Sequence, residues 1–441
     1  MLDNMGASDA RTHTLRVLLL VLLAVIAYLP VLRMPFIEDD YVMIPMSSVY
    51  AAQHWAPLLH DLDFRTRPMQ LFMNVAVDRM FGYKPLPYYA ANILLHALCV
   101  LLIYAAGVWT ELGFTASFWA AGFFAVYEGH QEAIMWASGS SELFVLLFGM
   151  ATWVCWVKWL EGGTWRWHAL AVIAFVLALF SKESAFVLPL LMLIPLLMDR
   201  SRLRRALIGI APFLAMAAVY VAWIWISRVA RPGYGDIRFS LSSPWPIVIA
   251  KSYWRMMFVW GIVAAAILWL MGGNSVRRII LISSLWMALG ILPYSFLTYM
   301  NQIPSRSTYL GSVGLALLAG AAAAVLLEQR RRTLLIILTA LVLATNLEIL
   351  WVKKMSQFRE RSEPSELLKQ AVAQANGPIS IDCTPLLPII AEVVVEQAGG
   401  KITAEQKRRE EHCFAIQYES RSGEHVSINQ AMATQKHGLF Y

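Results

Sequence analysis

The sequence predicts an all-α polytopic membrane protein that ends in a small α/β domain. Of its 441 residues, 59% are hydrophobic and only 15% are charged, a combination that soluble domains of this length do not have. The apolar runs are about 17–25 residues long, as spanning helices require, whereas the strands of a membrane barrel are about ten residues long and alternate. Tryptophan (17) and tyrosine (16) are abundant, as in the aromatic belts at membrane interfaces.

The first expected span is Leu15–Leu32, which follows a short polar tail. It is long and lacks a small-x-small cleavage site, so we expect it to be retained rather than removed as a signal peptide. Further apolar runs follow and bring the expected total to about eleven spans. They cover residues 88–109, 114–130, 141–160, 167–181, 184–198, 206–227, 254–271, 279–297, 307–327 and 333–352.

A long loop, residues 34–87, separates the first two spans and begins with the acidic cluster Glu38-Asp39-Asp40. Charged groups at the mouth of a span are costly in lipid, so these carboxylates should face water or a cavity. Two segments of the loop, Tyr41–Leu59 and Met69–Phe81, mix apolar and polar residues at helical spacing. We expect helices that lie in the membrane interface, with ordinary helices of a soluble loop as the alternative.

We divide the chain into a membrane domain, residues 1–352, and a small polar domain, residues 353–441. Periodicity in the second part predicts alternating helices and strands and therefore an α/β domain. The expected elements are a helix over Ser365–Ala375, a strand over Ile379–Cys383, a helix over Leu386–Ala398 and a strand over Cys413–Tyr418.

Basic residues in short loops predict the orientation, because such loops remain cytoplasmic. Three basic clusters fall on the same side as the N-terminus: Arg200, Arg202, Arg204 and Arg205; Arg277 and Arg278; and Arg330, Arg331 and Arg332. The acidic loop and the C-terminal domain fall on the opposite side, which we expect to be periplasmic in a bacterial inner membrane. A second set of basic residues also lies on that side and could line a site for an anion: Arg228, Arg231, Arg238, Lys251 and Arg255.

The net charge of +7 suits anionic lipid surfaces and phosphate ligands. No long basic run or recognition motif accompanies it, so we do not expect nucleic acid as a partner. Two of the four cysteines, Cys99 and Cys155, lie in apolar runs and are expected to pack there. Cys383 and Cys413 lie in the polar C-terminal part and are a candidate disulfide if that part is in an oxidising compartment.

The acidic loop is the first candidate for catalysis. Transfer of a sugar from a phosphate-linked lipid needs a base for the acceptor hydroxyl, a fixed position for the anomeric carbon, and positive charge for the departing phosphate. Either Asp39 or Asp40 would supply the base, with Glu38 beside them. The alternative is that these acids simply end a helix in solvent.

Three cations are candidates for phosphate binding. Arg306, at the entrance to a late span, can grip phosphate with its planar fork, or it can snorkel to the interface. Lys182 can neutralise a phosphate or simply pair with Glu183 at its turn, and Arg67 can bind an anion or fix the long loop.

His130 and Glu132 sit at the end of another span. Their spacing is not that of a metal pair on one helical face, so we expect hydrogen bonds to substrate or to the acidic loop, or a structural role at the interface. Neighbouring acids leave open a divalent cation, Mg²⁺ or Mn²⁺, that would bridge phosphate oxygens. No spacing in the sequence requires one.

Several motifs occur in a familiar order over residues 36–314. They resemble the GT-C glycosyltransferases, and among these the tetratricopeptide-repeat-linked membrane O-mannosyltransferases and their bacterial relatives. The motifs are Phe36-Ile37-Glu38-Asp39-Asp40, Arg67-Pro68-Met69, Phe81-Gly82-Tyr83-Lys84-Pro85, Asn92-Ile93-Leu94-Leu95-His96-Ala97, the run from His130 to Gly139, Leu179-Phe180-Ser181-Lys182-Glu183, Leu292-Pro293 and Arg306-Ser307-Thr308-Tyr309-Leu310.

The resemblance implies a GT-C-type bundle with a large first non-cytoplasmic loop, a polyprenyl-phosphate sugar donor and inversion at the anomeric carbon. It makes an Asp of the pair Asp39-Asp40 the base. By position in the motifs, Arg306, Lys182, Arg67 and Tyr309 become contacts for substrate and phosphate. Glu38, His130, Glu132 and Glu183 become walls of the active site.

The chain departs from the family pattern at three points. Ser305 stands where the family has Glu, Glu128 stands where it usually has a second His, and no repeat array follows the last span. The acceptor therefore stays open between a hydroxyl on protein, on lipid and on glycan.

Two other functions remain as alternatives. A transporter or flippase of lipid-linked sugars should show paired halves and interrupted helices with polar groups near the midplane, and we find no repeated halves. A polysaccharide polymerase or ligase is chemically close to a transferase. A large soluble loop between late spans would favour it, and the loop over residues 228–253 is short.

Overall fold

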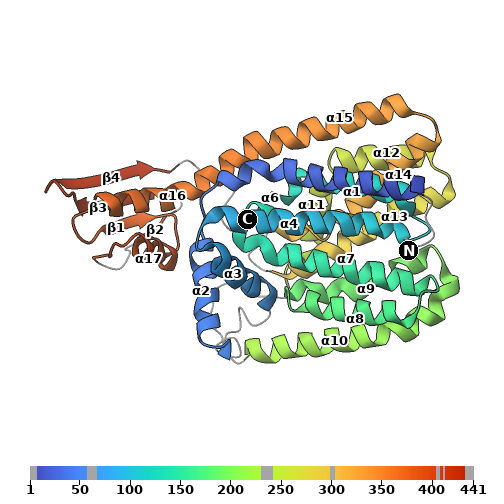
Figure 1. Cartoon of the computed structure of the whole chain (residues 1–441), viewed down its shortest axis with the longest axis horizontal. Helices are drawn as coiled ribbons and strands as arrows, with labels where there is room; N and C mark the ends of the chain where they lie inside the picture. Colours follow the sequence, from blue (N-terminus) through green and yellow to red (C-terminus); the bar gives the residue numbers. More distant parts are fainter. Residues whose placement is uncertain are drawn as a thin grey trace.

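The computed structural model describes residues 7–56, 67–229, 242–297, 303–403, 408–410 and 413–432. Figure 1 shows a bundle of long helices from which a small sheet domain extends at one end. The expected mostly helical membrane protein with a small C-terminal sheet is confirmed. The helices of the bundle are α1 (Ala7–Tyr28), α4 (Pro85–Ala105), α5 (Gly113–Val126), α7 (Ser140–Leu160), α8 (Trp165–Leu179), α9 (Leu188–Met192), α10 (Leu203–Val229), α11 (Trp245–Met257), α12 (Trp260–Met271), α13 (Asn274–Ile291), α14 (Ser312–Glu328) and α15 (Arg332–Glu348).

Short turns of helix connect many of these elements and hold several polar residues, among them Glu128, Glu132 and Arg306. A short α-helix, α6 (Gln131–Ile134), lies among them. The 3₁₀ turns are η1 (Leu29–Arg33), η3 (Ala106–Val108), η4 (Glu128–His130), η5 (Ala137–Gly139), η6 (Glu183–Val187), η7 (Ile194–Leu197), η8 (Arg200–Arg202), η9 (Leu292–Phe296) and η10 (Ser305–Thr308).

Within the described residues, six helices are long and apolar enough to cross a membrane. The pair α11 and α12, bent by 77°, would bring the number to seven if it forms one broken span. Four further apolar helices are shorter: Gly113–Val126, Trp165–Leu179, Glu183–Leu197 and Ser312–Glu328. The eleven expected spans correspond in order to these segments, but length and composition support a crossing for six or seven, so the count of eleven is not confirmed.

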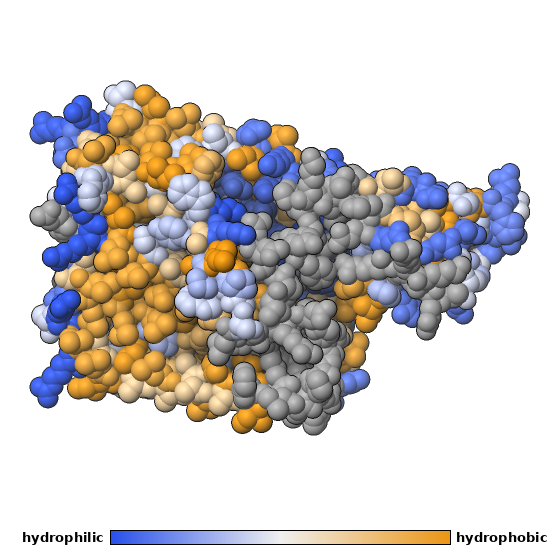
Figure 2. Space-filling view, turned by 180° about the vertical axis from the view of Figure 1, so that it is seen from behind, coloured by the Kyte–Doolittle hydropathy of each residue, from blue (hydrophilic) through white to orange (hydrophobic). Residues whose placement is uncertain are grey.

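The surface of the bundle is that of an integral membrane protein. Figure 2 shows a broad apolar area over the helical body, with polar residues at its ends and over the sheet domain. Large apolar side chains such as Ile208, Val219 and Ile336 are about two-thirds exposed (69%, 70% and 67%). Such exposure is unfavourable in water and is expected of helices that face lipid.

Helix α14 lies at the centre of the bundle because its sequence is rich in small residues. Gly314 packs against the backbone of α13 at Ser283, and Gly320 packs against the backbone of α5 at Ala116 and Ala120, so closely that a Cβ atom at either glycine would clash. Small residues that let backbones approach are the usual means of packing helices in membranes. The close packing of α14 fixes η10, which immediately precedes it.

Two helices of the long loop, α2 (Asp40–Ala52) and α3 (Pro68–Phe81), lie against one end of the bundle, the end near the sheet domain (Figure 1). They correspond to the expected helices over Tyr41–Leu59 and Met69–Phe81, although residues 57–59 lie outside the described residues. Helix α3 begins at Pro68, whose missing N–H is not needed in a first helical turn. The acidic cluster stands directly before and within the first turn of α2.

The last helix of the bundle continues without interruption into the C-terminal part. α15 passes through a π-helical segment, η11 (Ile349–Lys354), into α16 (Met355–Gln374), and the whole helix is 43 residues long. Figure 1 shows it running along the bundle and then out to the sheet. The boundary that the sequence places between residues 352 and 353 therefore falls inside a helix.

The C-terminal part contains a four-stranded sheet with strand order β2-β1-β3-β4. β1 (Ser380–Thr384) pairs with β2 (Arg408–Arg409) in parallel and with β3 (Cys413–Glu419) antiparallel, and β3 pairs with β4 (His425–Ala431) antiparallel. Helices α16 and α17 (Pro388–Gln397) pack against each other beside the sheet, and their buried apolar residues join those of β1 and β3 in one core. Strands β2 and β4 were not predicted from the sequence.

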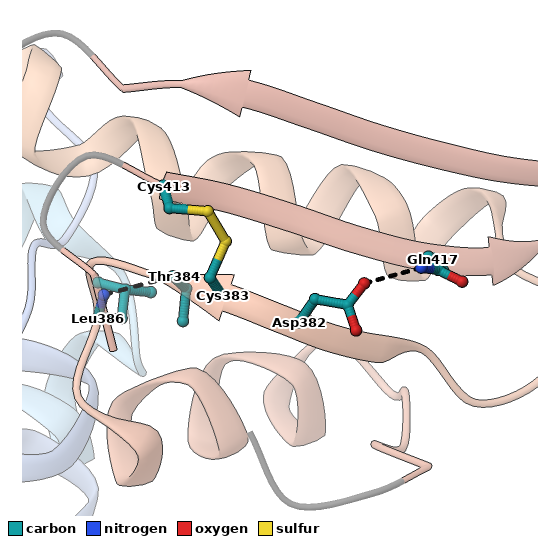
Figure 3. Close-up of a disulfide and its surroundings, with 6 residues drawn as sticks. All are labelled: Asp382, Cys383, Thr384, Leu386, Cys413 and Gln417. Carbon is teal, nitrogen blue, oxygen red and sulfur yellow. Dashed lines mark hydrogen bonds between the residues drawn. A yellow bond between two sulfur atoms is a disulfide. The ribbon is translucent and has the colours of Figure 1, made fainter. Parts of the chain in front are cut away.

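A disulfide joins Cys383 of β1 to Cys413 of β3, with the two Cα atoms 5.7 Å apart (Figure 3). Beside it on the same two strands, Gln417 donates a hydrogen bond of 2.8 Å to Asp382. The bridge closes a loop of 30 residues, which includes α17, and it therefore limits the freedom of this whole segment in the unfolded chain.

We predict that Cys383→Ser lowers the free energy of unfolding of the C-terminal part by about 3–4 kcal/mol, from the entropy of a loop of this length. Pulse proteolysis of the full chain in detergent measures this loss. Cys155→Ser, at a free cysteine in α7, is the matched control and should leave protection unchanged. Equal protection of both variants would contradict the prediction.

Candidate functional site

The acidic loop is held by an arginine from the far end of the chain. Arg361 of α16 donates two hydrogen bonds to Glu38, from Nε to Oε1 (2.7 Å) and from Nη2 to Oε2 (2.6 Å). The pair is well shielded from solvent, with side-chain exposures of 14% and 5%. Such a bidentate pair is stronger and more directional than a single ion pair, so it fixes the position of Glu38.

Asp40 is fully buried and its carboxylate is occupied. Oδ1 accepts hydrogen bonds from the backbone N–H (2.8 Å) and the hydroxyl (2.6 Å) of Ser138, and Oδ2 accepts one from the N–H of Ile37 (3.2 Å). Burial raises the pKa of Asp40 to about 7, although these hydrogen bonds oppose the shift. Asp40 therefore ties the start of α2 to the turn η5 and has no exposed surface.

Asp39 has a different environment. It is partly exposed, and among the described residues its carboxylate accepts no hydrogen bond and forms no ion pair. Burial raises the pKa of Asp39 above its ordinary value and Glu38 raises it further, while Arg306 and Arg361 lower it. Asp39 is thus the carboxylate of the loop that is available to a substrate, and two arginines are near it.

Arg306 reaches this site from η10. Its backbone N–H donates to Oε2 of Glu132 (3.2 Å), and its guanidinium lies 3.9 Å from the same oxygen. Burial alone would raise the pKa of Glu132, but Arg306 and Arg361 outweigh burial and lower it. The side chain of Arg306 keeps 24% of its surface exposed and makes no bidentate pair with Glu132, so an anion can approach it.

Trp136 contacts both arginines. The guanidinium carbon of Arg306 is 4.8 Å from the ring centroid, and that of Arg361 is 5.1 Å from it. Cations within about 6 Å of an indole face are attracted by its quadrupole. The ring therefore helps to position both arginines, whose charges act on Asp39, without neutralising them.

A second polar cluster lies deeper in the bundle. Lys182 donates to Glu142 (2.5 Å), and the hydroxyl of Tyr294 donates to the other oxygen of Glu142 (2.6 Å). At its edge, Arg67 forms an ion pair with Glu183 (2.9 Å). Burial lowers the pKa of Lys182, although Glu142 opposes this shift. Lys182 and Arg67 therefore each form an ion pair with a carboxylate, which balances their charges.

Tyr309 and His130 lie away from the acidic loop, inside the bundle. Both are fully buried. The hydroxyl of Tyr309 is 2.7 Å from Nδ1 of His96, and Nε2 of His130 is 2.7 Å from the hydroxyl of Ser312. This position gives Tyr309 no exposed surface for contact with a phosphate, and it places His130 in an aromatic core instead of an open wall of the site.

Two further cations stand near the site. Lys354, in the π-helical segment, lies 4.0 Å from Glu128, and Arg255 of α11 donates to the carbonyl of Ile303 (2.5 Å). Both feel the charges of Glu128 and Glu132. The π-helical turn is a rare feature that often marks functional sites, and here it carries Lys354 toward the acids.

The acids of the loop do not form a metal site. Glu38 is paired with Arg361, Asp40 is surrounded by donors, and Glu132 lies against two arginines. In the part of the chain that the structure describes, no group of three or more His, Cys, Asp or Glu is placed to hold a metal ion. These side chains, as they are paired, do not fit a divalent cation.

An apolar groove of about 300 Å³ runs along the bundle between α1, α5, α12, α14 and α15. Its lining is apolar apart from Thr339. At the end nearer the site, the groove reaches Val126 and Val342. Glu128 follows Val126 by two residues, and its N–H donates to Asn346 on α15 (2.9 Å). The groove therefore ends beside the ion pair of Glu128 and Lys354.

Sequence reasoning missed Arg361, Ser138 and the acid Glu142. Glu142 carried a usable signal, because a charged residue within an apolar run is expensive and usually functional or paired. Arg361 carried none, since it is one of several charges in a polar helix and its partner lies 323 positions earlier. Ser138 stands inside a quoted motif, but only the fold shows that it binds Asp40.

No family model matches the chain. A protein O-mannosyl-transferase of Caenorhabditis elegans is 25% identical over 279 residues, which cover 58% of this chain and 38% of that protein. The chain thus spans about two-fifths of the length of this curated relative.

Two solved structures share the fold. One is ArnT from Cupriavidus metallidurans bound to undecaprenyl phosphate, with a TM-score of 0.54 and 13% identity over 86% of this chain and 84% of ArnT. The other is the archaeal oligosaccharyltransferase AglB from Archaeoglobus fulgidus in complex with an inhibitory peptide and a dolichol-phosphate. Its TM-score is 0.54, with 10% identity over 84% of this chain and 59% of AglB. The chain therefore has the fold of the GT-C glycosyltransferases.

We predict that Asp40→Asn destabilises the protein by about 1–3 kcal/mol, since an amide nitrogen cannot accept hydrogen bonds and leaves at least one buried backbone N–H without an acceptor. Asp39→Asn should not destabilise the protein, because burial disfavours the charged form of Asp39 and its carboxylate accepts no hydrogen bond among the described residues. Thermal unfolding of both variants in detergent measures the difference. Equal stability of the two variants would show that Asp40 does not hold the loop.

Proposed function

We propose that this protein is a glycosyltransferase that moves a sugar from a polyprenyl-phosphate donor to a hydroxyl acceptor, with inversion at the anomeric carbon. The observation that carries the proposal is the Asp39 carboxylate, which is unpaired among the described residues and lies close enough to Arg306 to feel its charge. The fold supports the reaction class. The acceptor stays open between protein, lipid and glycan hydroxyls.

Asp39, and not Asp40, is the proposed general base. A base must reach the hydroxyl proton within hydrogen-bond distance. Asp40 is fully buried and its two oxygens already accept three hydrogen bonds. Asp39 is partly exposed and accepts none among the described residues, which supports its assignment.

Arg306 is the proposed contact for the donor phosphate. Its side chain is partly exposed and its guanidinium lies over the ring of Trp136, and a planar fork suits phosphate oxygens. The charges of Lys182 and Arg67 are balanced by Glu142 and Glu183. We therefore assign Lys182 and Arg67 a structural role in the site and not a contact with the phosphate. Arg255 and Lys354 add positive potential nearby.

The transfer is a single displacement. The acceptor oxygen forms a bond to the anomeric carbon while the bond between that carbon and the phosphate oxygen breaks. The hydroxyl proton moves to the Asp39 carboxylate, and the polyprenyl phosphate leaves with the electron pair, stabilised by Arg306. Catalysis is then positioning, proton removal and charge stabilisation in a partly desolvated site.

The apolar groove supports a lipid-linked donor. It lies between helices of the bundle, its lining is almost entirely apolar, and it ends near Glu128 and Lys354 at the level of the site. An isoprenoid chain laid in it would gain about 25 cal/mol for each Å² of apolar surface that it buries. The fold neighbours were solved with undecaprenyl phosphate and with a dolichol-phosphate, and we extend that class of lipid to this chain.

We place the site on the periplasmic face of a bacterial inner membrane, with the N-terminus in the cytoplasm. The basic clusters at 200–205, 277–278 and 330–332 support this orientation, because basic loops stay cytoplasmic. The Cys383–Cys413 bridge supports an oxidising compartment for the C-terminal part. We also propose residues 1–352 as the catalytic membrane domain and residues 353–441 as the periplasmic domain.

We predict that purified protein in lipid transfers labelled sugar from a polyprenyl-phosphate donor, and that Asp39→Asn lowers kcat by about 10²–10⁴-fold, the usual contribution of a general base. Donor affinity should hardly change in Asp39→Asn, whereas Arg306→Ala should weaken it. Turnover and donor binding are measured separately for each variant. Normal turnover of Asp39→Asn would exclude this residue as the base.

We predict that Gly122→Leu raises KM for a long-chain donor several-fold and affects a short-chain donor much less. A Cβ at Gly122 meets only a side-chain atom of Leu20, at 3.9 Å, so the new side chain fits and occupies the groove. Ala266→Leu, at an exposed position of α12, is the matched control. An equal effect of Gly122→Leu on both donors would place the lipid chain elsewhere.

A further inference from the structure

We propose that Arg361 is a positioning residue of the active site, through which the C-terminal part of the chain sets the conformation of the acidic loop and the orientation of Asp39. This inference rests on the proposed function. It concerns a residue that belongs to no motif of the membrane part and that lies beyond the last helix of the bundle, on α16. Four observations support it.

The first is the ion pair itself. Arg361 approaches Glu38 through both Nε and Nη2, at 2.7 and 2.6 Å, and the Glu38 side chain is only 5% exposed. Removing one partner of such a shielded pair leaves the other charge buried without compensation, which is far more costly than losing a surface pair. Glu38 therefore cannot leave Arg361 without a large rearrangement.

The second is the backbone of Glu38. Its φ angle is +46°, a left-handed conformation that is unfavourable for a non-glycine residue. Strained backbone of this kind persists only where the surroundings hold it. The bidentate pair holds the side chain of Glu38, and the hydrogen bonds of Asp40 hold the other side of the loop, so Asp39 between them has a fixed direction.

The third is the support of Arg361. Its guanidinium carbon lies 5.1 Å from the ring of Trp136 and 4.9 Å from the ring of Phe358. Its Nη1 lies 3.9 Å from Glu132. Two aromatic rings and two carboxylates thus fix a side chain that is otherwise long and flexible, and Arg361 can transmit the position of α16 to the loop.

The fourth is a second link between the C-terminal part and the same loop. Gln397 at the end of α17 donates to the carbonyl of Tyr41 (3.3 Å), and the ammonium of Lys369 on α16 lies 4.8 Å from the Tyr41 ring centroid. Tyr41 stands two residues after Asp39. The C-terminal part of the chain therefore contacts the loop on both sides of Asp39, at Glu38 and at Tyr41.

The charge of Arg361 also affects the base directly. The charged groups that face Asp39 are Glu38 in its own loop, Asp40 on α2, Arg306 on η10 and Arg361 on α16, and Glu132 on α6 faces both arginines. Without Arg361, the charge of Glu38 is no longer balanced, so the pKa of Asp39 rises further. Because the base must be ionised, the acid limb of the rate profile then moves to higher pH.

The test compares Arg361→Met, Arg361→Lys and the control Arg359→Met, which removes an exposed arginine of the same helix, in the full-length protein. Arg361→Met should lower kcat by about 10–100-fold, the cost of a small misplacement, and leave KM for donor within about threefold. Its acid limb should move up by about one pH unit. Arg361→Lys should restore the pH profile and recover kcat only in part, since lysine keeps the charge without the fork.

A second measurement does not depend on turnover. The amides of Asp40, Tyr41 and Val42 donate to the carbonyls of Ile37, Glu38 and Asp39 (3.0, 3.2 and 3.0 Å). Hydrogen exchange of a peptide that contains them should accelerate in Arg361→Met and in Glu38→Gln but not in Arg359→Met, because these bonds open when the loop is released. All variants are first checked for a single species by size-exclusion chromatography.

The outcomes separate the two proposals. Exchange unchanged in both Arg361→Met and Glu38→Gln would overturn the positioning role whether or not the protein turns over a donor. Faster exchange with no turnover by the wild-type protein would overturn the proposed function and leave the positioning of the loop supported. An effect of Arg359→Met equal to that of Arg361→Met would mean that the charge of α16 matters and the pairing with Glu38 does not.

Discussion

The arrangement of the site depends on how three adjacent carboxylates are accommodated at the end of a membrane bundle. A desolvated charge is stable only when it is paired or surrounded by donors. Glu38 is paired with Arg361, and Asp40 is surrounded by the donors of Ser138 and Ile37. Asp39 is left between them, near positive charge but without a partner among the described residues. Each residue of the cluster thus has its own environment, and Asp39, the proposed base, differs from Glu38 and Asp40 in having no partner among the described residues.

The turn η10 connects the two polar clusters of the protein. Arg306 faces Glu132 and the acidic loop, while Ser307, the next residue, lies 3.5 Å from Glu142 in the deeper cluster. The turn leads directly into α14, whose small residues pack tightly against α5 and α13. The closely packed helix α14 therefore anchors the turn that carries Arg306, the cation that faces the acids.

The fold could be predicted from the sequence to the extent that it depends on local pattern. Apolar runs such as 15–32 and 88–109 identify helices, and Ile379–Cys383 identifies a strand. Both can be predicted because the hydrophobicity and periodicity that define them are properties of adjacent residues. It is harder to predict which runs cross the membrane. Trp165–Leu179 and Ser312–Glu328 are short, and their depth in the bilayer depends on the helices packed beside them. The site shows the same limit. The motif locates Asp39 and Asp40, but only Ser138, brought in by the fold, distinguishes them, and only α16 brings Arg361 to Glu38.

The unbroken helix from Arg332 to Gln374 has a consequence for how the chain can vary. Its 43 residues extend about 65 Å, roughly twice the hydrocarbon thickness of a bilayer. Each residue inserted or deleted between the bundle and Arg361 would turn everything beyond it by about 100° and swing the guanidinium away from Glu38. The number of residues in this stretch is therefore constrained, because only lengths that keep Arg361 on the same side of the helix preserve its pair with Glu38. A different terminal domain can be joined without loss of the pair only beyond Arg361.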